Sequence, residues 1–167
     1  MLSEFQQKAV WEHWLGAEIR ANYFADLSHT YTNRQKWFTW LTLLLSSGAF
    51  AALIGNWVPP QFGWIKPVLP FLTAVISITS LVEQNQKKVT DTADLHLRWN
   101  RIATEYESLW NNIYSENAAS RFEELAERRA ELSKSGLSFP NDEKRMLRWE
   151  GHVLQHRAPG YQMPVAV

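Results

Sequence analysis

Apolar residues gather in two adjacent blocks in the first half of the chain. The first block, residues 37–58, has 22 residues and no charge, and the second, residues 64–82, has 19 residues and one charge, Lys66. A helix needs roughly 20 apolar residues to cross the ~30 Å hydrocarbon core of a bilayer. We therefore predict two transmembrane helices over these blocks. The alternative is a buried hairpin within a soluble helical bundle.

The residues at the block ends fit a membrane hairpin. Aromatic rings stand where amphipathic side chains favour the headgroup level: Trp37, Phe38, Trp40, Trp57 and Trp64. Residues 59–63 hold Pro59, Pro60 and Gly63, which stop one helix and cannot continue it. We expect these residues to form a short extracytoplasmic turn.

Basic residues set the expected orientation. Arg34 and Lys36 precede the first block, Lys87 and Lys88 follow the second, and only Lys66 lies near the turn. Because basic residues are enriched on the cytoplasmic side, both termini should lie in the cytoplasm. The predicted topology is therefore multi-pass.

Residues 1–36 are predicted to form a cytosolic amphipathic helix. Ser3 and Gln6 match a capping box at its start. Apolar residues then recur at three-and-four spacing along one stripe: Val10, Trp14, Ala17, Ala21, Phe24 and Tyr31. No helix breaker separates this stripe from Trp37, so one helix should run from the cytosolic segment into the first apolar block.

Residues 83–134 are predicted to form cytosolic helices. Bulky residues step four and three positions apart, as in a coiled-coil seam: Leu95, Trp99, Ile102, Tyr106, Leu109 and Ile113. We call these six residues the seam. A second helix is expected from about Ala119 to Lys134, and residues 135–167 should hold a last helix, capped by Asn141 or Asp142, and an irregular tail. The predicted fold is all-α, a two-helix membrane hairpin with long cytosolic extensions that form a bundle.

Charge and composition exclude several function classes. The chain is neutral, with 17 basic and 17 acidic residues, so no basic surface for nucleic acid is implied. It has no cysteine, which excludes disulfides and thiolate chemistry. We find no phosphate-binding glycine loop, nucleophile elbow or zinc-protease motif, and predict neither an enzyme nor a cofactor.

Two side-chain clusters invite a chemical interpretation, but a solvated helix face explains both better. His152 and His156 stand at i and i+4, yet two histidines without a third ligand make a weak metal site. An acidic run with interleaved arginines covers residues 123–131, where Glu124 and Arg128 form an i, i+4 pair. We therefore predict no metal site and no catalytic carboxylates.

Small and hydroxyl residues inside the apolar blocks remain as candidates for function. On the first block, small residues repeat every fourth position, a spacing that favours close helix packing: Ser47, Gly48, Ala51, Ala52 and Gly55. On the second block, polar residues share one face that Lys66 extends: Thr73, Ser77, Ser80 and Gln84. This face is expected to line a pore, although hydroxyl groups in membrane helices also serve as packing contacts.

The chain resembles the SLATT family of two-transmembrane effector domains, which occur beside bacterial nucleotide-signalling genes. The resemblance covers roughly residues 10–135. It rests on the hydropathy layout, on Arg20 and Tyr23 before the first block, on the Ser-Ser-Gly centre of that block at residues 46–48, and on the seam. It implies an antiphage effector that permeabilises the bacterial inner membrane after an upstream sensor or second-messenger system is activated.

Two functions follow as expectations. In the first, the chain assembles into a homo-oligomer and forms a pore, because two helices in one copy cannot enclose water. In the second, the blocks only anchor the chain to the lipid bilayer, and the cytosolic bundle recruits a partner protein. A hydroxyl stripe that faces the central axis of an assembly would distinguish the pore from the scaffold.

Overall fold

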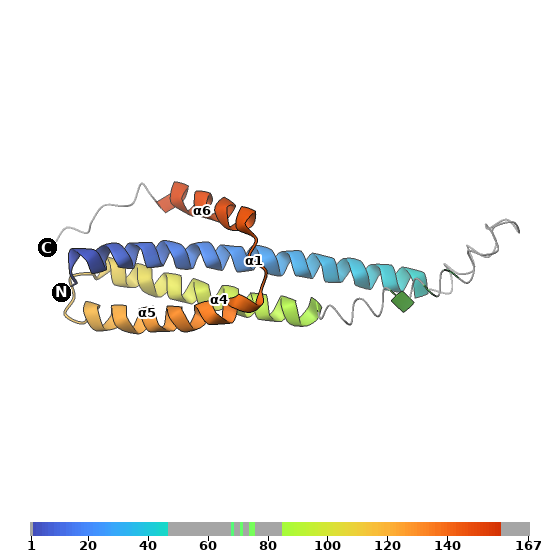
Figure 1. Ribbon diagram of the computed structural model, residues 1–167, viewed down its shortest axis with the longest axis horizontal. Helices are drawn as coiled ribbons and strands as arrows, with labels where there is room; N and C mark the ends of the chain where they lie inside the picture. Colours follow the sequence, from blue (N-terminus) through green and yellow to red (C-terminus); the bar gives the residue numbers. More distant parts are fainter. Residues whose placement is uncertain (1, 47–67, 69–70, 72–73, 76–84, 158–167) are drawn as a thin grey trace, which may run out of the picture. The chain divides into compact units, whose positions relative to one another are not determined.

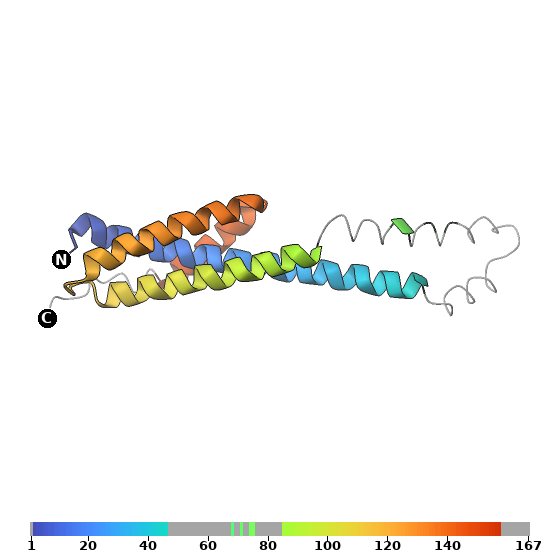
Figure 2. The same cartoon turned by 90° about the horizontal axis from the view of Figure 1, so that it is seen from below.

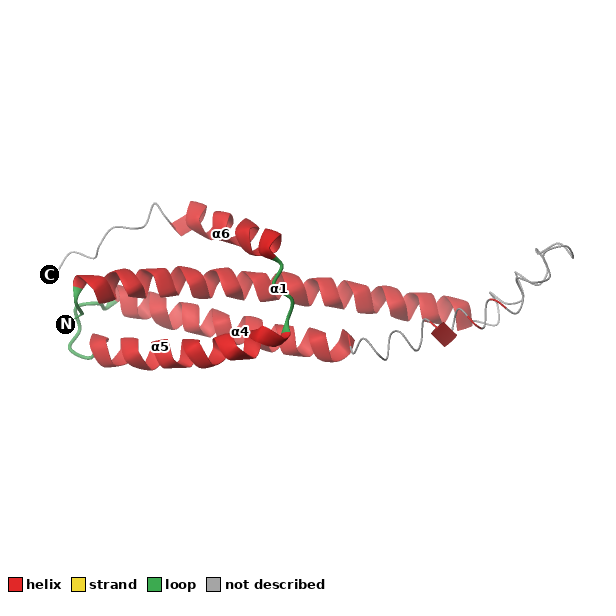
Figure 3. Cartoon of the chain, in the orientation of Figure 1, coloured by secondary structure: helices red, strands yellow, loops and turns green. Residues whose placement is uncertain are grey.

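The computed structural model describes residues 2–46, 68, 71, 74–75 and 85–157, and every regular element among them is helical (Figure 3). The elements are α1 (Glu4–Ser46), α4 (Asn85–Asn111), α5 (Ala118–Ser135), the short 3-10 helix η2 (Gly136–Ser138) and α6 (Glu143–Arg157). No strand occurs in these residues, so the prediction of an all-α fold is confirmed for them.

The helix ends follow the local sequence signals. At the start of α1, the Ser3 backbone N–H donates to Gln6 Oε1 at 2.9 Å and the Gln6 N–H donates to Ser3 Oγ at 3.3 Å, which confirms the capping box. Asp142 caps α6, because its carboxylate accepts the Arg145 N–H at 3.1 Å. α1 continues without interruption through Ser46, as expected from the absence of a breaker before Trp37.

The chain divides into two compact units. The first unit contains Met1–Leu27 and Asp91–Val167, and the second contains Ser28–Thr90. α1 and α4 contribute residues to both units, whereas α5 and α6 belong to the first.

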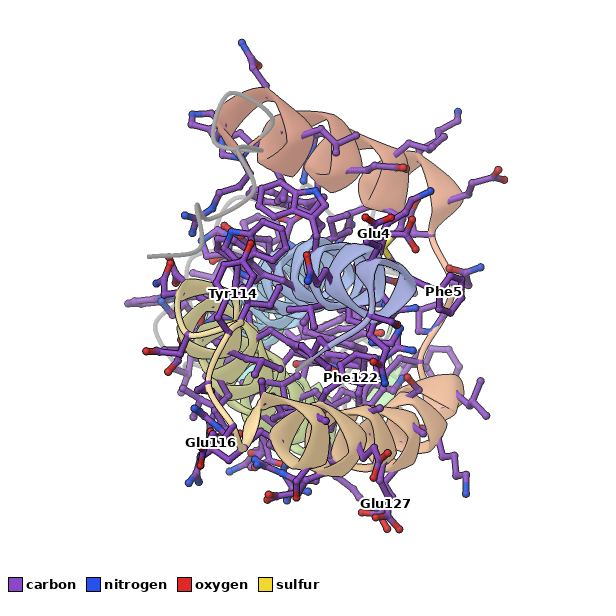
Figure 4. The ribbon with its side chains drawn as sticks, turned by 90° about the vertical axis from the view of Figure 1, so that its left-hand side faces the viewer. Glu4, Phe5, Tyr114, Glu116, Phe122 and Glu127 are labelled. Carbon is purple, nitrogen blue, oxygen red and sulfur yellow. The ribbon has the colours of Figure 1, made fainter. Side chains whose placement is uncertain are left out.

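In the first unit, α1 lies between α6 on one side and α4 with α5 on the other (Figures 1 and 4). α1 and α4 run antiparallel, since contacts join Ala21 to His96 and Trp11 to Trp110. The turn between α4 and α5 lies at the same end of the unit as the start of α1 (Figure 2). α1, α4 and α5 therefore form a bundle, and α6 covers its outer face along α1.

Aromatic residues dominate the core of this bundle. All six seam residues are buried, and four of them are among the least exposed side chains: Trp99, Tyr106, Leu109 and Ile113. From α1, the expected stripe buries Val10, Trp14 and Phe24. Trp11 packs edge-on against Trp14 at 5.1 Å between ring centroids and contacts Trp110 at 5.2 Å. Trp11 and Trp110 lie outside the predicted stripe and the seam, so the aromatic interface between α1 and α4 is wider than the three-and-four spacing predicted.

In the second unit, the described parts of α1 and α4 also pair antiparallel. Ser28 Oγ donates to the Val89 carbonyl at 3.5 Å, and the Lys88 ammonium lies 5.9 Å from the Tyr31 ring centroid. Further along α1, Trp37 and Trp40 expose 68% and 71% of their surface. The exposed apolar surface of this unit therefore begins where the first apolar block begins.

The described residues include no helix with both the length and the apolar character required to cross a bilayer. Residues 47–58 of the first predicted span, the predicted turn 59–63 and most of residues 64–82 lie outside the described part of the chain. The membrane hairpin therefore stays a prediction.

Candidate functional site

A column of polar and aromatic side chains runs through the bundle of the first unit. Each helix supplies two members seven residues apart, which places both on one face of that helix. The six residues are His13 and Arg20 of α1, Trp99 and Tyr106 of α4, and Phe122 and Arg129 of α5. We call them the interior column.

His13, Tyr106 and Phe122 form one level of the interior column. The His13 ring stacks on Phe122 with a centroid distance of 5.7 Å, and Tyr106 Oη lies 3.3 Å from His13 Nδ1. Phe122 points toward α1, whereas Glu127 of the same helix points away from the bundle (Figure 4). This level is aromatic, with one internal hydrogen bond.

Arg20 and Trp99 form the next level, and Arg129 lies close enough to act on both levels. The Arg20 guanidinium carbon lies 5.1 Å from the Trp99 ring centroid, a cation–π contact. Arg20 Nη1 also donates to the Gly16 carbonyl at 3.1 Å. A Cβ atom at residue 16 would lie 3.3 Å from this nitrogen, so glycine gives the guanidinium room to fold back along α1.

The electrostatics of the interior column reflect burial and an excess of positive charge. Burial, reinforced by the charge of Arg129, lowers the pKa of Arg20. Burial also lowers the pKa of His13, with a further contribution from Arg129. Burial raises the pKa of Tyr106 to about 12, although Arg129 acts in the opposite direction. Two guanidinium groups therefore share an interior with groups that remain neutral near pH 7.

Two N–H groups in the interior column have no hydrogen-bond acceptor. These are Trp99 Nε1, on a side chain only 1% exposed, and Arg129 Nε. A buried donor without an acceptor costs roughly 1–3 kcal/mol. The interior column therefore contains hydrogen-bond donors for which the described residues provide no acceptor.

A cavity of about 350 Å³ adjoins Arg20 and Trp99. Its other walls come from α1, from the end of α5 and from the segment that leads into α6. They are Tyr23, Phe24, Ser133, Gly136, Leu137, Phe139, Pro140, Asn141 and Met146. The lining is mainly apolar and aromatic, with one guanidinium and a few neutral polar groups.

Tyr23 holds the segment that forms one wall of this cavity. Its hydroxyl donates to the Pro140 carbonyl and accepts the Asp142 backbone N–H at 3.3 Å. Beyond this point, Arg145 and Arg148 pair with Asp26. At the far end of α6, contacts to α1 and α4 come from Arg157, which binds Glu18 at 3.1 Å and Glu107 at 3.4 Å.

Three arginines on the outside of the bundle have carboxylate partners, unlike those of the interior column. Arg128 pairs through both terminal nitrogens with Glu105, and Arg101 Nε binds the same carboxylate at 3.1 Å. Arg98 pairs with Asp94 at 2.8 Å. A second, surface cavity of about 320 Å³ between α4 and α5 is lined by Arg98, Arg101 and Arg128 together with Glu131. Its positive charge is therefore largely compensated.

The predicted site residues divide into two groups. The seam lies in the core described above. The predicted pore-lining residues Lys66, Thr73, Ser77, Ser80 and Gln84, and the predicted packing residues Ser47, Gly48, Ala51, Ala52 and Gly55, all lie outside the described residues. Their roles stay predictions.

The sequence interpretation missed most of the interior column, although a signal was present. His13 and Arg20 stand seven residues apart, within one turn of buried positions of the α1 stripe such as Ala17 and Ala21. A cationic side chain next to an apolar stripe can lay its stem on apolar surface, which makes it a candidate for partial burial. Arg129 could not be assigned in this way, because its distance from Arg20 depends on how α5 packs.

The histidine pair of α6 forms a local contact. The rings of His152 and His156 stack at 4.3 Å, and His156 Nδ1 lies 2.8 Å from the His152 carbonyl oxygen. Nowhere in the described ranges do three potential metal ligands gather.

Comparison of the chain with protein families, curated proteins and solved structures found no match.

Proposed function

We propose that this protein is a membrane effector of a bacterial antiphage defence system. In this proposal, residues 37–58 and 64–82 cross the inner membrane as a hairpin, and the bundle lies in the cytoplasm. Copies then assemble so that Thr73, Ser77 and Ser80 line a pore that depolarises the cell. The resemblance to the SLATT family is the basis of the biological role, and the two long apolar blocks are the basis of the membrane step.

The observation that carries the membrane step is the change in exposure along α1. In the first unit, Trp11 and Trp14 are 8% and 6% exposed, whereas Trp37 and Trp40 in the second unit are 68% and 71% exposed. Leu43 and Leu44 continue the exposed apolar surface, at 57% and 53%. Large contiguous apolar surfaces indicate contact with a partner or a membrane.

The antiparallel pairing of α1 and α4 supports an even number of membrane crossings. The hydrogen bond between Ser28 and Val89 requires both residues to lie on the same side of any bilayer. The chain between them must therefore cross an even number of times, and two apolar blocks fit two crossings. This argument is independent of the basic residues that predict the orientation.

The alternative is a membrane-anchored scaffold. Leu147 and Leu154 stand seven residues apart on α6 and are 57% and 40% exposed, which favours a docking role for this helix. In that case the two apolar blocks would anchor the chain in the membrane without forming a pore for ions or solutes.

Dye release from liposomes separates the two functions. Purified protein reconstituted into proteoliposomes should release a small trapped dye. The double variant Ser77→Leu, Ser80→Leu should insert normally, because leucine favours a bilayer helix, but should lose release, because an apolar constriction excludes water. Ile78→Leu is the matched control and should release dye like the wild type. Full release from the double variant would remove residues 64–82 from the pore lining, and no release from wild type would favour the scaffold.

Cysteine labelling tests the topology separately. The chain has no native cysteine. An impermeant thiol reagent added to whole spheroplasts should label Gln61→Cys, whereas it should label Ser135→Cys only after lysis. Labelling of residue 135 in intact spheroplasts would contradict the cytoplasmic placement of the bundle without deciding whether a pore forms.

A further inference from the structure

The two arginines of the interior column have no carboxylate partner, unlike three arginines on the outside of the bundle. Arg98, Arg101 and Arg128 each have one at 4 Å or less. In the described part of the chain, no acidic side chain forms an ion pair with Arg20 or Arg129, and the charge of Arg129 acts on the half-buried Arg20 guanidinium. Buried charges normally have a partner, because desolvation without one is costly. The interior column therefore carries uncompensated positive charge.

The cavity beside Arg20 has the size and chemistry of a small-molecule site. Its volume of about 350 Å³ falls within the range of roughly 300–1,000 Å³ that ligand pockets occupy. Phe24, Trp99 and Phe139 give it aromatic walls, while the Arg20 guanidinium supplies one cation. A pocket with apolar walls and a single cation complements an anion carried on an apolar or aromatic body.

The Arg20 guanidinium is the group of the cavity lining that favours an anionic occupant. One of its nitrogens donates to the Gly16 carbonyl, and no carboxylate among the described residues lines the cavity beside it. An anion supplies acceptor atoms and negative charge together, which neutral water supplies only in part. The Tyr23 contacts to Pro140 and Asp142 hold one wall of the cavity in place, and its volume of about 350 Å³ suits a compact molecule better than a two-chain lipid.

We propose that this cavity binds a small organic anion, a carboxylate or phosphate monoester on an aromatic or apolar body, with Arg20 as its main charged contact. Trp99 and Phe139 pack against the apolar body. Arg129 strengthens the positive potential from the adjacent position on α5. This binding site is independent of the proposed membrane step and of the pore-lining residues.

Calorimetric titration of the full-length protein in an uncharged detergent tests the proposal. The probes are phenyl phosphate, naphthyl phosphate and phenylacetate, with benzyl alcohol as the neutral match. At least one anion should bind saturably with one site per chain, and benzyl alcohol should not. Arg20→Gln should weaken binding by about tenfold or more, since it removes a charge-assisted contact. Arg98→Gln is the matched control, and its affinity should stay within about twofold of wild type.

Thermal unfolding without added anion separates a binding role of Arg20 from a structural one. Arg20→Met removes a half-buried cation that is repelled by the charge of Arg129, so the ligand-free variant should unfold at the same or a higher temperature than wild type. Adding the anion should raise the unfolding temperature of wild type only. A fall in unfolding temperature for Arg20→Met, with no anion effect on wild type, would assign Arg20 to the fold and overturn the proposal.

Two further outcomes would also overturn it. The first is an absence of saturable binding for all three anions at millimolar concentrations. The second is displacement of the bound anion by phosphatidylglycerol in the micelle, which would assign the positive charge to a lipid headgroup instead of a small soluble ligand.

Discussion

The two ends of α1 present the same residue pair to opposite environments. Trp11 and Trp14 stand three residues apart and are buried in the first unit, whereas Trp37 and Trp40, with the same spacing, are largely exposed in the second. The difference comes from what surrounds the helix. Rings from α4 and a guanidinium from α6 cover the first pair, as shown by Trp110 against Trp11 and by Arg157, 4.9 Å from the Trp14 ring centroid. Residue type and spacing alone therefore do not decide burial.

The largest expected difference lies in stability. Trp14→Ala should lower the free energy of unfolding of the first unit by about 3–5 kcal/mol, because it leaves a cavity in an aromatic core. Trp40→Ala should change the same quantity by less than about 0.5 kcal/mol, as exposed substitutions generally do. Denaturant unfolding in an uncharged detergent, followed by circular dichroism, measures both. Equal losses in the two variants would show that the second pair is also buried by the fold.

The second prediction concerns membrane affinity. Here the exposed pair, Trp37 and Trp40, should matter more than the buried pair, Trp11 and Trp14. The double variant Trp37→Ala, Trp40→Ala should partition into lipid vesicles about tenfold or more weakly, because it removes two apolar side chains worth about 1.5–3 kcal/mol each when buried. Flotation of vesicles on a density gradient measures the bound fraction. Trp14→Ala serves as the control and should float like wild type under conditions where it stays folded. Unchanged flotation of the double variant would separate these exposed rings from membrane contact.

The third prediction concerns Glu105, which links α4 to α5 in the first unit. Burial alone would raise the pKa of this carboxyl, but hydrogen bonds and charge from Arg128 and Arg101 outweigh it, and the pKa lies below its usual value of 4.5. The ionised Glu105 carboxylate therefore adds its full contribution to the free energy of unfolding above about pH 4.5. This contribution is lost as the pH falls through the lower folded-state pKa. Glu105→Gln should cost about 1 kcal/mol at pH 7, and the cost should vanish in acid.

Unfolding curves between pH 3 and 7 measure this dependence. Glu127→Gln, at the outward-facing position of α5, is the control and should follow wild type at every pH. A constant difference between Glu105→Gln and wild type across this range would rule out the ion pair as its origin.

The smallest expected effect comes from His13. Burial, with the charge of Arg129, lowers its pKa below 6.5 in the folded state. The folded state therefore resists protonation, and stability is complete above pH 6.5 and declines as the pH falls toward the folded-state pKa. His13→Gln should remove part of this decline between pH 7 and 5, by less than the Glu105 effect. The exposed His29→Gln is the control, and an unchanged decline in His13→Gln would contradict the assignment.

Local signals were sufficient for the helices of the first unit. The Ser3–Gln6 capping box, the Asp142 cap, the end of α5 near Gly136 and the burial of the seam all depend on residues close in sequence, where spacing determines geometry. The predicted pair of Glu124 with Arg128 also occurs, at 3.8 Å. These features required no knowledge of how the helices pack.

Contacts between different helices could not be predicted from the sequence. The acidic and basic run of α5 was interpreted as a solvated face, but Arg128 contacts Glu105 of α4 more closely than its own neighbour Glu124. The i, i+4 rule considers one helix at a time and cannot find such a partner. For the same reason, spacing did not reveal that Arg20 and Arg129 approach each other or that Tyr23 holds the segment before α6.

The weak attachment of α6 determines the order in which the first unit opens. α6 buries one side chain, Val153, and otherwise depends on exposed or half-buried ion pairs of Arg145, Arg148 and Arg157. Its backbone amides should therefore exchange with solvent deuterium before those of α4, whose seam is buried, and should do so faster at high salt. Because Met146 of α6 forms part of one wall of the cavity beside Arg20, detachment of α6 should also widen the access of solutes to Arg20. The exchange rate of the α6 amides and the association rate of a ligand in this cavity should therefore both rise with salt concentration.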